Sequence, residues 1–595
     1  MHAKAARPKQ LHALHYRVQA TQLHAHLFDV MLTLMPQAQQ VRLSLPVWIP
    51  GSYMVREFSR HLQGLQAHQG KRPLSVQQIS KHCWQLDCAP GQPVTVTWQV
   101  YAFDASVRTA WLDTQRGFFN PTSLCLAVIG QEDRPHHLEV LPPPQCNNWR
   151  LATALAPLKV RRSGFGTYLA ADYDELADSP VEMGLFESTT FTVRGVVHRL
   201  VLAGASASVD LPRLRADTRR ICQTALEFWH GRERPVLRSY TFMLWAVGEG
   251  YGGLEHCHST ALICSRKDLP RLGEATQSED YRKLLGLISH EYFHAWNVKR
   301  LRPGPLARID YSRENYTDLL WFFEGFTSYY DDLLLRRAGL IDDAAYLALL
   351  TKTLQHVLST PGRQIQSVAQ ASFDAWIRYY RPDENTPNST VSYYTKGALV
   401  ALCLDLRLRA EGHAGGLDAI MRALWQRCAG GPMQEADVLA VLHDHTGRAW
   451  NADIQAWVHG TRELPVLDLL QAQGVQVQHE PLPWVEQLGL RVQEGAAGVR
   501  IKTVLSGSAA QAAGLAAGDE LLAVQLPARR TRTAQAWRVL SLEQLRLHLG
   551  PARNCDLLVA RDQRLLWQSI SLPAARTQPV LRVADTALLR QWLGA

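Results

Sequence analysis

Two histidines and a glutamate lie at a spacing that can hold a metal ion and activate water. His290, Glu291 and His294 form an H-E-x-x-H pattern, and the residues before it, from 284 to 288, are mostly apolar at helical spacing. On a helix, positions i and i+4 lie on the same face, so both imidazoles can point at one ion. Glu291 lies about 100° around the same turn, where it reaches a water on that ion without being a ligand. The pattern is that of a zinc hydrolase.

A third ligand is predicted 30 residues after the second histidine. Glu324 is a lone acid inside an apolar run that begins at Leu319, and a buried carboxylate is costly unless it is paired or bound to a metal. We therefore predict one zinc ion per chain, held by His290, His294 and Glu324, with the fourth position left to water. The alternative is a core helix with two hydrogen-bonded histidines, and the lone acid argues against it.

A glycine-rich stretch at 248–260, GEGYGGLEHCHST, offers another carboxylate. It lacks the Lys-Ser/Thr pair of a phosphate loop. Gly252 and Gly253 instead permit the close backbone approach that a strand pairing with a peptide substrate requires, and Glu255 then lies near the metal. His256 and His258, at i and i+2 of the predicted strand, would point the same way. Because three ligands already complete a metal site, we interpret them as substrate-side or structural.

These segments resemble the glycyl aminopeptidase family of metallopeptidases. The resemblance rests on HEYFHAWNVKRLRP followed by WFFEGFTSYYDDLLLRRAGL. The relatives of that family are the alanyl-type aminopeptidases and thermolysin, and all are gluzincins. Trp296 and the E-G-F run that begins at Glu324 are shared with the alanyl type, in which the interval from the second His to the Glu is shorter. The resemblance covers nearly the whole chain and is most specific from 251 to 400.

The resemblance implies roles for two further residues. G-G-L-E-H is similar to the G-x-M-E-N strand of alanyl-type enzymes, whose Glu grips the free α-ammonium of the substrate, so Glu255 would anchor the amine, with His256 in place of the Asn. Y-T-K-G matches the Y-x-K-G element, so the Tyr394 hydroxyl would donate to the oxyanion of the tetrahedral intermediate, and Tyr393 would be a core aromatic. A small first residue, Gly or Ala, is the implied preference.

The elements around the site predict a multidomain α+β chain. Short alternating runs before about residue 190 predict an all-β domain of antiparallel strands at 1–190. A thermolysin-like zinc catalytic domain would follow at 191–340, with the strand at 240–247 at a sheet edge beside the zinc helix. A helical domain at 341–475 would complete the active site.

Three segments of the N-terminal region also resemble the family. They are WIPGSYMVREFSRHL, YAFDASVRTAWLDTQRGFFNPTSL and DYDELADSPVEMG. We interpret them as structural, with buried Arg and Asp pairs at a domain interface. A contribution to a substrate wall is the alternative.

Residues 488–524 resemble a bacterial-type PDZ domain, which we expect to span 480–578 with a closing helix within 579–595. Leu488, Gly489 and Leu490 would form its carboxylate-binding loop. A PDZ domain binds a peptide C-terminus or strand by adding it to its sheet edge.

Composition and charge narrow the remaining classes. The 595 residues suffice for about three or four domains. The net charge of +9 comes from scattered basic residues, and the small cluster at Arg529, Arg530 and Arg532 predicts a solvated loop, so no nucleic-acid partner is expected. The sequence contains no run of about 18 apolar residues, so we expect no membrane-spanning helix. The N-terminus lacks the apolar core of a signal peptide and the ten cysteines are scattered, so we expect a cytoplasmic protein with reduced thiols.

Together these features predict a zinc aminopeptidase that cleaves the first bond of peptides with a free N-terminus. Two alternatives stay open. One is a zinc endopeptidase of the same chemistry, in which Glu255 binds no amine. The other is a peptide-binding scaffold that works through the PDZ domain and carries a vestigial site.

Overall fold

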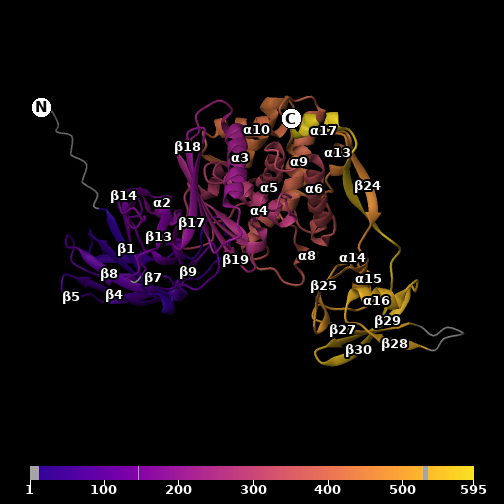
Figure 1. Cartoon of the computed structure of the whole chain (residues 1–595), viewed down its shortest axis with the longest axis horizontal. Helices are drawn as coiled ribbons and strands as arrows, with labels where there is room; N and C mark the ends of the chain where they lie inside the picture. Colours follow the sequence, from indigo (N-terminus) through magenta and orange to yellow (C-terminus); the bar gives the residue numbers. More distant parts are fainter. Residues whose placement is uncertain (1–12, 145, 527–533, 595) are drawn as a thin grey trace. The chain divides into compact units, whose positions relative to one another are not determined.

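The computed structural model describes residues 13–144, 146–526 and 534–594 (Figure 1). The first twelve residues and the arginine cluster at 529–532 lie outside this range, so the expectations on the N-terminus and on that cluster stay predictions. The chain forms two compact units, Met1–Tyr316 with Trp425–Gln434, and Thr317–Leu424 with Glu435–Ala595. None of the described helices is both long enough and apolar enough to cross a membrane.

The first unit begins with a β-rich region of three sheets around one apolar core. The largest sheet contains, in spatial order, β14 (Ala156–Val160), β15 (Gly166–Ala170), β12 (His136–Leu141), β1 (Leu14–Gln22), β2 (Leu27–Leu34), β8 (Val94–Tyr101), β4 (Leu62–Gln69) and β5 (Arg72–Pro73). The second contains β13 (Arg150–Thr153), β16 (Val181–Gly184), β10 (Arg116–Phe119) and β9 (Ala110–Leu112), and the third β11 (Ala127–Val128), β3 (Gln40–Ser44), β7 (Cys83–Asp87) and β6 (Val76–Ser80). Side chains of β8 alternate between buried and partly exposed, as a half-buried strand requires. One pair departs from the predicted antiparallel pattern, because β1 and β12 are parallel.

A five-stranded sheet follows and carries the strand next to the candidate site. Its order is β17 (Phe186–Val193), β18 (Val196–Ala203), β19 (Ser239–Val247), β21 (Ser259–Ser265) and β20 (Tyr251–Glu255). The prediction that the 240–247 strand lies at the edge was wrong: β19 lies in the centre, parallel to both neighbours. Its residues 240–244 are all buried, which is the pattern of a strand covered on both faces. The sheet ends at β17 on one side and at β20 on the other, and β20 pairs antiparallel with β21 alone among the described strands.

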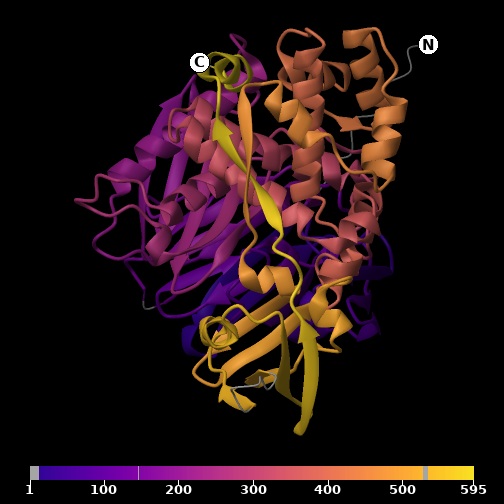
Figure 2. The same ribbon diagram turned by 90° about the vertical axis from the view of Figure 1, so that its right-hand side faces the viewer.

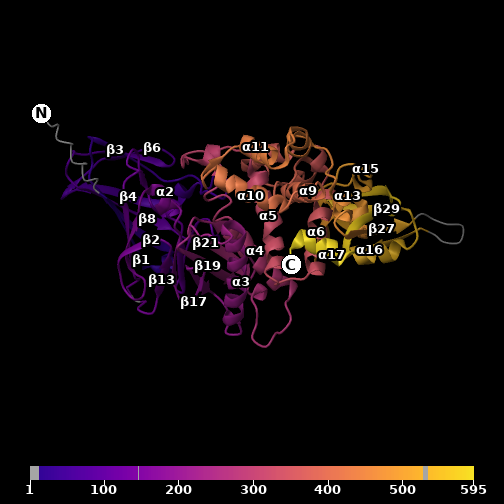
Figure 3. The same ribbon diagram turned by 90° about the horizontal axis from the view of Figure 1, so that it is seen from above.

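Helices α3 (Leu211–His230) and α4 (Glu279–Phe293) lie beside this sheet (Figure 3). The Ser278 hydroxyl caps α4 by accepting from the Tyr281 amide, and Glu279 and Asp280 follow in the first turn, where acids favour the positive end of the helix dipole. The helix ends at Phe293, so His294 is its C-terminal cap. His290 and His294 therefore lie on the last turn of α4.

The second unit is built from helices that surround α5 (Leu320–Arg337) and α9 (Thr395–Ala410). Among the surrounding helices are α6 (Asp343–Leu358), α7 (Val368–Phe373), α8 (Thr386–Ser389), α11 (Glu435–Thr446), α13 (Val466–Gln471) and α17 (Thr586–Leu593). The closing helix α17 returns to α5, where the Trp592 indole donates to the Tyr329 hydroxyl at 3.2 Å.

The PDZ fold lies between two strands that pair with each other, β24 (Val475–Pro481) and β31 (Thr577–Val583). Figure 2 shows this pair as an orange and a yellow ribbon side by side. The main sheet contains β25 (Leu490–Gly495), β26 (Gly498–Val504), β27 (Glu520–Leu526), β29 (Asn554–Arg561) and β30 (Arg564–Ser571), and β28 (Gln535–Arg538) pairs with β27. Three helices accompany it, α14 (Trp484–Leu488), α15 (Ala509–Ala512) and α16 (Leu542–Leu549). In the described residues β25 is an edge strand.

Candidate active site

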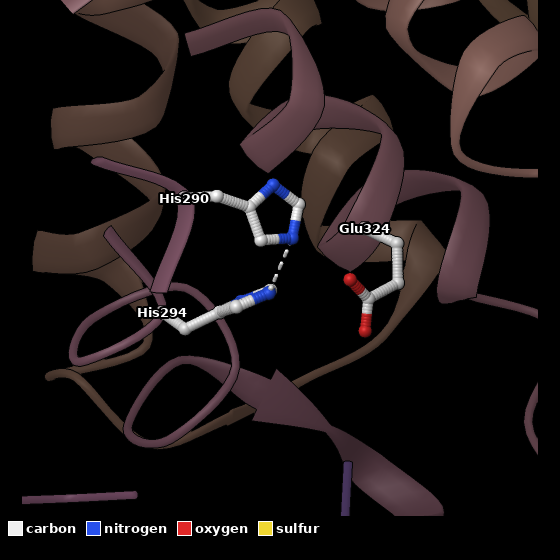
Figure 4. A group of neighbouring side chains, drawn as sticks. All are labelled: His290, His294 and Glu324. Atoms are coloured by element: carbon white, nitrogen blue, oxygen red, sulfur yellow. Dashed lines mark hydrogen bonds between the residues drawn. The ribbon is translucent and has the colours of Figure 1, made fainter. Parts of the chain in front are cut away.

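Three predicted ligands lie together. His290 and His294 turn their rings toward each other, and the Glu324 carboxylate lies beside them (Figure 4). The two Nε2 atoms are 3.1 Å apart, and one ligand atom from each of the three residues lies within 4.8 Å of the others. Zn–N bonds of 2.0–2.1 Å in a tetrahedron place two nitrogens roughly 3.3 Å apart. The pair is therefore spaced as two ligands of one ion.

The hydrogen bond of His294 prepares it for a metal. Its Nδ1 lies 2.7 Å from the Asn297 carbonyl, which can only accept, so Nδ1 donates and the lone pair stays on Nε2. His294 is 1% exposed and Glu324 is 2% exposed. A buried carboxylate and two facing imidazole nitrogens form a donor set that suits zinc, so the residues present fit the ion.

The segment after α4 is held by a histidine that the sequence analysis did not single out. The Trp296 indole donates to Nε2 of His230, the last residue of α3, at 2.8 Å. Burial, with the nearby charges of Arg194 and Arg300, lowers the pKa of His230 to about 4. The ring is therefore neutral at physiological pH and can accept this hydrogen bond.

The predicted general base, Glu291, lies against the edge strand. A Cβ on Gly253 would collide with the Glu291 carboxylate, so a larger residue at this position of β20 would have to push that carboxylate aside. Glu291 is 5% exposed. The Gly-Gly pair thus brings the backbone of β20 into contact with the carboxylate that would activate water.

Glu255 ends the same strand and is covered by a turn from the β-rich region. Gly51 has a φ of +88°, and a Cβ placed on it would lie 2.5 Å from the nearer carboxylate oxygen of Glu255. Glu255 is 5% exposed and lines a cavity of about 380 Å³. The WIPGSYM segment, which we interpreted as structural, therefore contacts a residue that is a candidate for binding substrate. The Pro-Gly turn in this segment was the sequence signal for the contact.

The two histidines after Glu255 differ from the prediction. Strand β20 ends at Glu255, so His256 and His258 do not share a strand face: His256 is buried and His258 is exposed. His256 Nδ1 lies 3.1 Å from the Asp178 carboxylate. No local pattern marks the end of a strand this short.

Asp178 joins the segment after β20 to the segment after α4. It accepts from Lys299 Nζ at 2.7 Å and from the Cys257 amide at 2.8 Å. Burial alone would raise the pKa of Asp178, but Lys299 and His256 hold it well below its usual range. The β-rich region also contains the pair of Arg116 and Glu182, joined at 2.7–2.8 Å.

In the second unit, two glycines set the distance between α5 and α9. A Cβ on Gly325 would lie 2.5 Å from the Gly397 Cα, so the E-G-F and Y-x-K-G motifs meet where these helices cross. Glu324 precedes one glycine, and Tyr394 lies at the N-terminal cap of α9, just ahead of the other. Burial and the negative charge of Glu324 raise the pKa of Tyr394 well above its usual value. The Tyr394 phenol therefore keeps its proton, as a hydrogen-bond donor must.

The predicted carboxylate-binding loop of the PDZ domain opens into a second cavity, of about 730 Å³. Leu488 ends α14, Gly489 has a φ of +76°, and Leu490 begins β25. Basic side chains from the PDZ domain, from α6 and from the turn after α6 line the cavity: Lys352, Arg363, Arg491 and Arg576. Glu486 is the acidic residue of the described lining. Arg363 is paired with Glu463 at 3.0 Å, and basic side chains still outnumber acidic ones in the described lining.

The fold and the ligand set define a metallopeptidase with an appended PDZ domain, and comparisons with known proteins agree. Residues 15–185 match the Peptidase M61 N-terminal domain, residues 283–400 match M61 glycyl aminopeptidase, and residues 477–533 match the PDZ domain. The crystal structure of an aminopeptidase N family protein from Idiomarina loihiensis is 37% identical, covers 98% of this chain and 100% of its own, and has a TM-score of 0.91. The chain belongs to the M61 glycyl aminopeptidase family.

An M1 zinc metallopeptidase from Deinococcus radiodurans is more distant, at 14% identity and a TM-score of 0.49 over 77% of this chain and 95% of that one. A search of the curated proteins found no match.

Proposed function

We propose that the protein is a zinc aminopeptidase that removes a small first residue, Gly or Ala, from peptides with a free N-terminus. One zinc ion per chain is held by His290, His294 and Glu324. The observation that carries the proposal is the placement of two carboxylates along β20, with Glu291 against Gly253 and Glu255 at the end of the strand.

The chemistry divides among this chain's residues. Zinc, when bound, polarises the scissile carbonyl and lowers the pKa of water to about 7. Glu291 takes a proton from the attacking water and passes it to the leaving amine. The Tyr394 hydroxyl donates to the oxyanion, and its burial keeps it protonated.

Glu255 restricts the reaction to the first peptide bond. A free α-ammonium that enters a largely dry site needs a carboxylate partner, and Glu255 is 5% exposed. The Gly51 turn contacts this carboxylate, so a residue ahead of the substrate amine would have to displace the turn. This supports an aminopeptidase over an endopeptidase.

Glu255→Gln tests the proposal. The wild type should hydrolyse Gly-anilide and Ala-anilide faster than Leu-anilide, barely cleave acetyl-Gly-anilide, and lose activity with a chelator. Because breaking one side of a buried charge pair costs about 3–5 kcal/mol, the variant should lose on the order of 10²–10³ in kcat/KM for Gly-anilide alone. Equal cleavage of blocked and free substrates by the wild type would favour the endopeptidase.

The PDZ cavity supports a second candidate function. Its basic lining suits the terminal carboxylate of a peptide that adds to the edge of β25. We infer that the loop formed by Leu488, Gly489 and Leu490 binds peptide C-termini there.

A further inference from the structure

Arg108 brings a guanidinium to the strand that the proposed substrate would pair with. It lies in the loop between β8 and β9, and its Nη2 donates to the Gly253 carbonyl at 3.1 Å. Its Nη1 lies 3.7 Å from the position of a Cβ on Gly252. Because β21 occupies one side of β20, a side chain that reaches this carbonyl from another domain lies along the open side of the strand.

The loop that carries Arg108 is held in place on both sides. Asn120, which is fully buried, donates from Nδ2 to the carbonyls of Val107 at 2.8 Å and Thr109 at 3.2 Å. The Arg108 amide donates to the Ser106 hydroxyl at 3.1 Å. The backbone on either side of Arg108 is therefore fixed before any ligand arrives, as a preorganised binding residue requires.

Arg108 has no carboxylate partner among the described residues. Its Nε is buried and has no hydrogen-bond acceptor there. A buried N–H without an acceptor is costly, and a guanidinium pairs best with a carboxylate through two parallel hydrogen bonds. Nearby Arg116 shows the satisfied arrangement, because two of its nitrogens bind Glu182. Arg108 thus carries donors suited to an oxyanion from outside the chain.

The order of residues along β20 indicates which part of a substrate meets Arg108. With its amine at Glu255 and its scissile bond at Glu291 beside Gly253, an antiparallel peptide runs on toward Gly252. We propose that Arg108 binds the terminal carboxylate of a dipeptide and so makes dipeptides the preferred substrates of the site. This inference rests on the proposed aminopeptidase function.

Three matched substrates test the assignment: Gly-Ala, its amide Gly-Ala-NH2, and Gly-anilide. Since a hydrogen bond to a charged group contributes about 1.5–3 kcal/mol, the wild type should prefer Gly-Ala to its amide by roughly 10- to 100-fold in kcat/KM. Arg108→Met should remove this preference, mainly through KM, and leave Gly-anilide within about threefold of the wild type. Arg108→Lys, which keeps the charge but not the fork, should fall between them.

Arg162→Met removes an exposed arginine of the same region and should change none of the three rates. An equal loss on Gly-Ala and Gly-anilide in both Arg108 variants would make Arg108 a structural residue and overturn the assignment. A wild type that treats Gly-Ala and Gly-Ala-NH2 alike would overturn it as well. A wild type that hydrolyses none of the three substrates would instead overturn the proposed function itself.

Discussion

Strands β20 and β25 are both sheet edges beside a candidate peptide site, yet their surroundings carry opposite charge. Glu255 is the last residue of β20, and the Glu291 carboxylate lies against Gly253 of that strand. Arg491 lies on β25, and it lines the PDZ cavity together with Arg576. An exposed edge offers any extended peptide the same backbone hydrogen bonds. On the proposals above, the backbone would supply the pairing at both edges, and the flanking charges would decide which peptide group is recognised: the amine at Glu255, where β20 ends, and the terminal carboxylate at β25.

The largest expected effect is the loss of catalysis beside β20 when the general base is removed. Glu291→Gln should keep the zinc, because Glu291 is not a ligand, and lower kcat by about 10³–10⁴, near the upper range for a general acid–base group. Turnover of Gly-anilide and the zinc content of the purified protein measure both. Glu249→Gln, at an exposed acid nearby, is the control and should keep full activity. A Glu291→Gln protein that turns over normally would remove Glu291 from the mechanism.

The second prediction concerns Tyr394, the proposed oxyanion donor of the site beside β20. Tyr394→Phe should lower kcat by about 10²–10³, the scale for one oxyanion donor, with little change in KM. Tyr393→Phe is the matched control, since Tyr393 is a fully buried neighbour on the same turn. Steady-state kinetics on Gly-anilide decide between them. A larger loss in Tyr393→Phe would shift the assignment by one residue.

Reversing the charge of Arg491 on β25 tests whether the PDZ cavity recognises a peptide carboxylate. Arg491→Glu places a carboxylate in the lining of the cavity, so a peptide with a free C-terminus should bind at least about tenfold more weakly. The amide of the same peptide should bind both proteins alike, and fluorescence titration with labelled peptides measures all four affinities. Exposed Arg500→Glu, on β26, is the control. Equal binding of acid and amide by the wild type would show that β25 does not read the carboxylate.

The smallest effect concerns the sheet that carries β20. His198, on β18, is fully buried and forms a 2.8 Å hydrogen bond with the Tyr292 hydroxyl. Burial lowers its pKa to about 4 from 6.5, so the unfolded chain takes up a proton that the fold excludes, and stability is lost as pH falls from 6.5 toward 4.

Between pH 7.5 and pH 5 the loss from His198 should be about 2 kcal/mol. Urea unfolding at the two pH values measures it. His198→Gln, which stays neutral and can keep the bond to Tyr292, should be less sensitive to pH by that amount. Equal pH sensitivity in the two proteins would contradict the burial argument.

Much of this arrangement follows from local sequence patterns, and the exceptions share a physical cause. The helix that carries His290 was predicted from apolar spacing and is present as α4, because caps and apolar spacing act within a few residues. Helical spacing also led to His290 and His294 as proposed metal ligands, and the lone acid in an apolar run led to Glu324.

What local patterns could not give is the set of contacts between distant segments. The Arg108–Gly253 hydrogen bond spans 145 residues, and the Lys299–Asp178 pair spans 121. The edge position of β20 also depends on partners that only the folded sheet reveals. Such pairs are fixed by topology, which periodicity alone does not specify.

The pairing of β24 with β31 has a consequence for how the chain can be cut and rejoined. Pro481 lies opposite Thr577, so the 95 residues between them form an oversized hairpin loop closed by the ribbon. Topologically, the PDZ domain is an insert, and the chain that follows it returns to α5 as α17. A two-residue Asn-Gly turn from 481 to 577 would restore an ordinary β-hairpin. Another binding domain could therefore replace the PDZ domain between Pro481 and Thr577 without interrupting the rest of the peptidase fold.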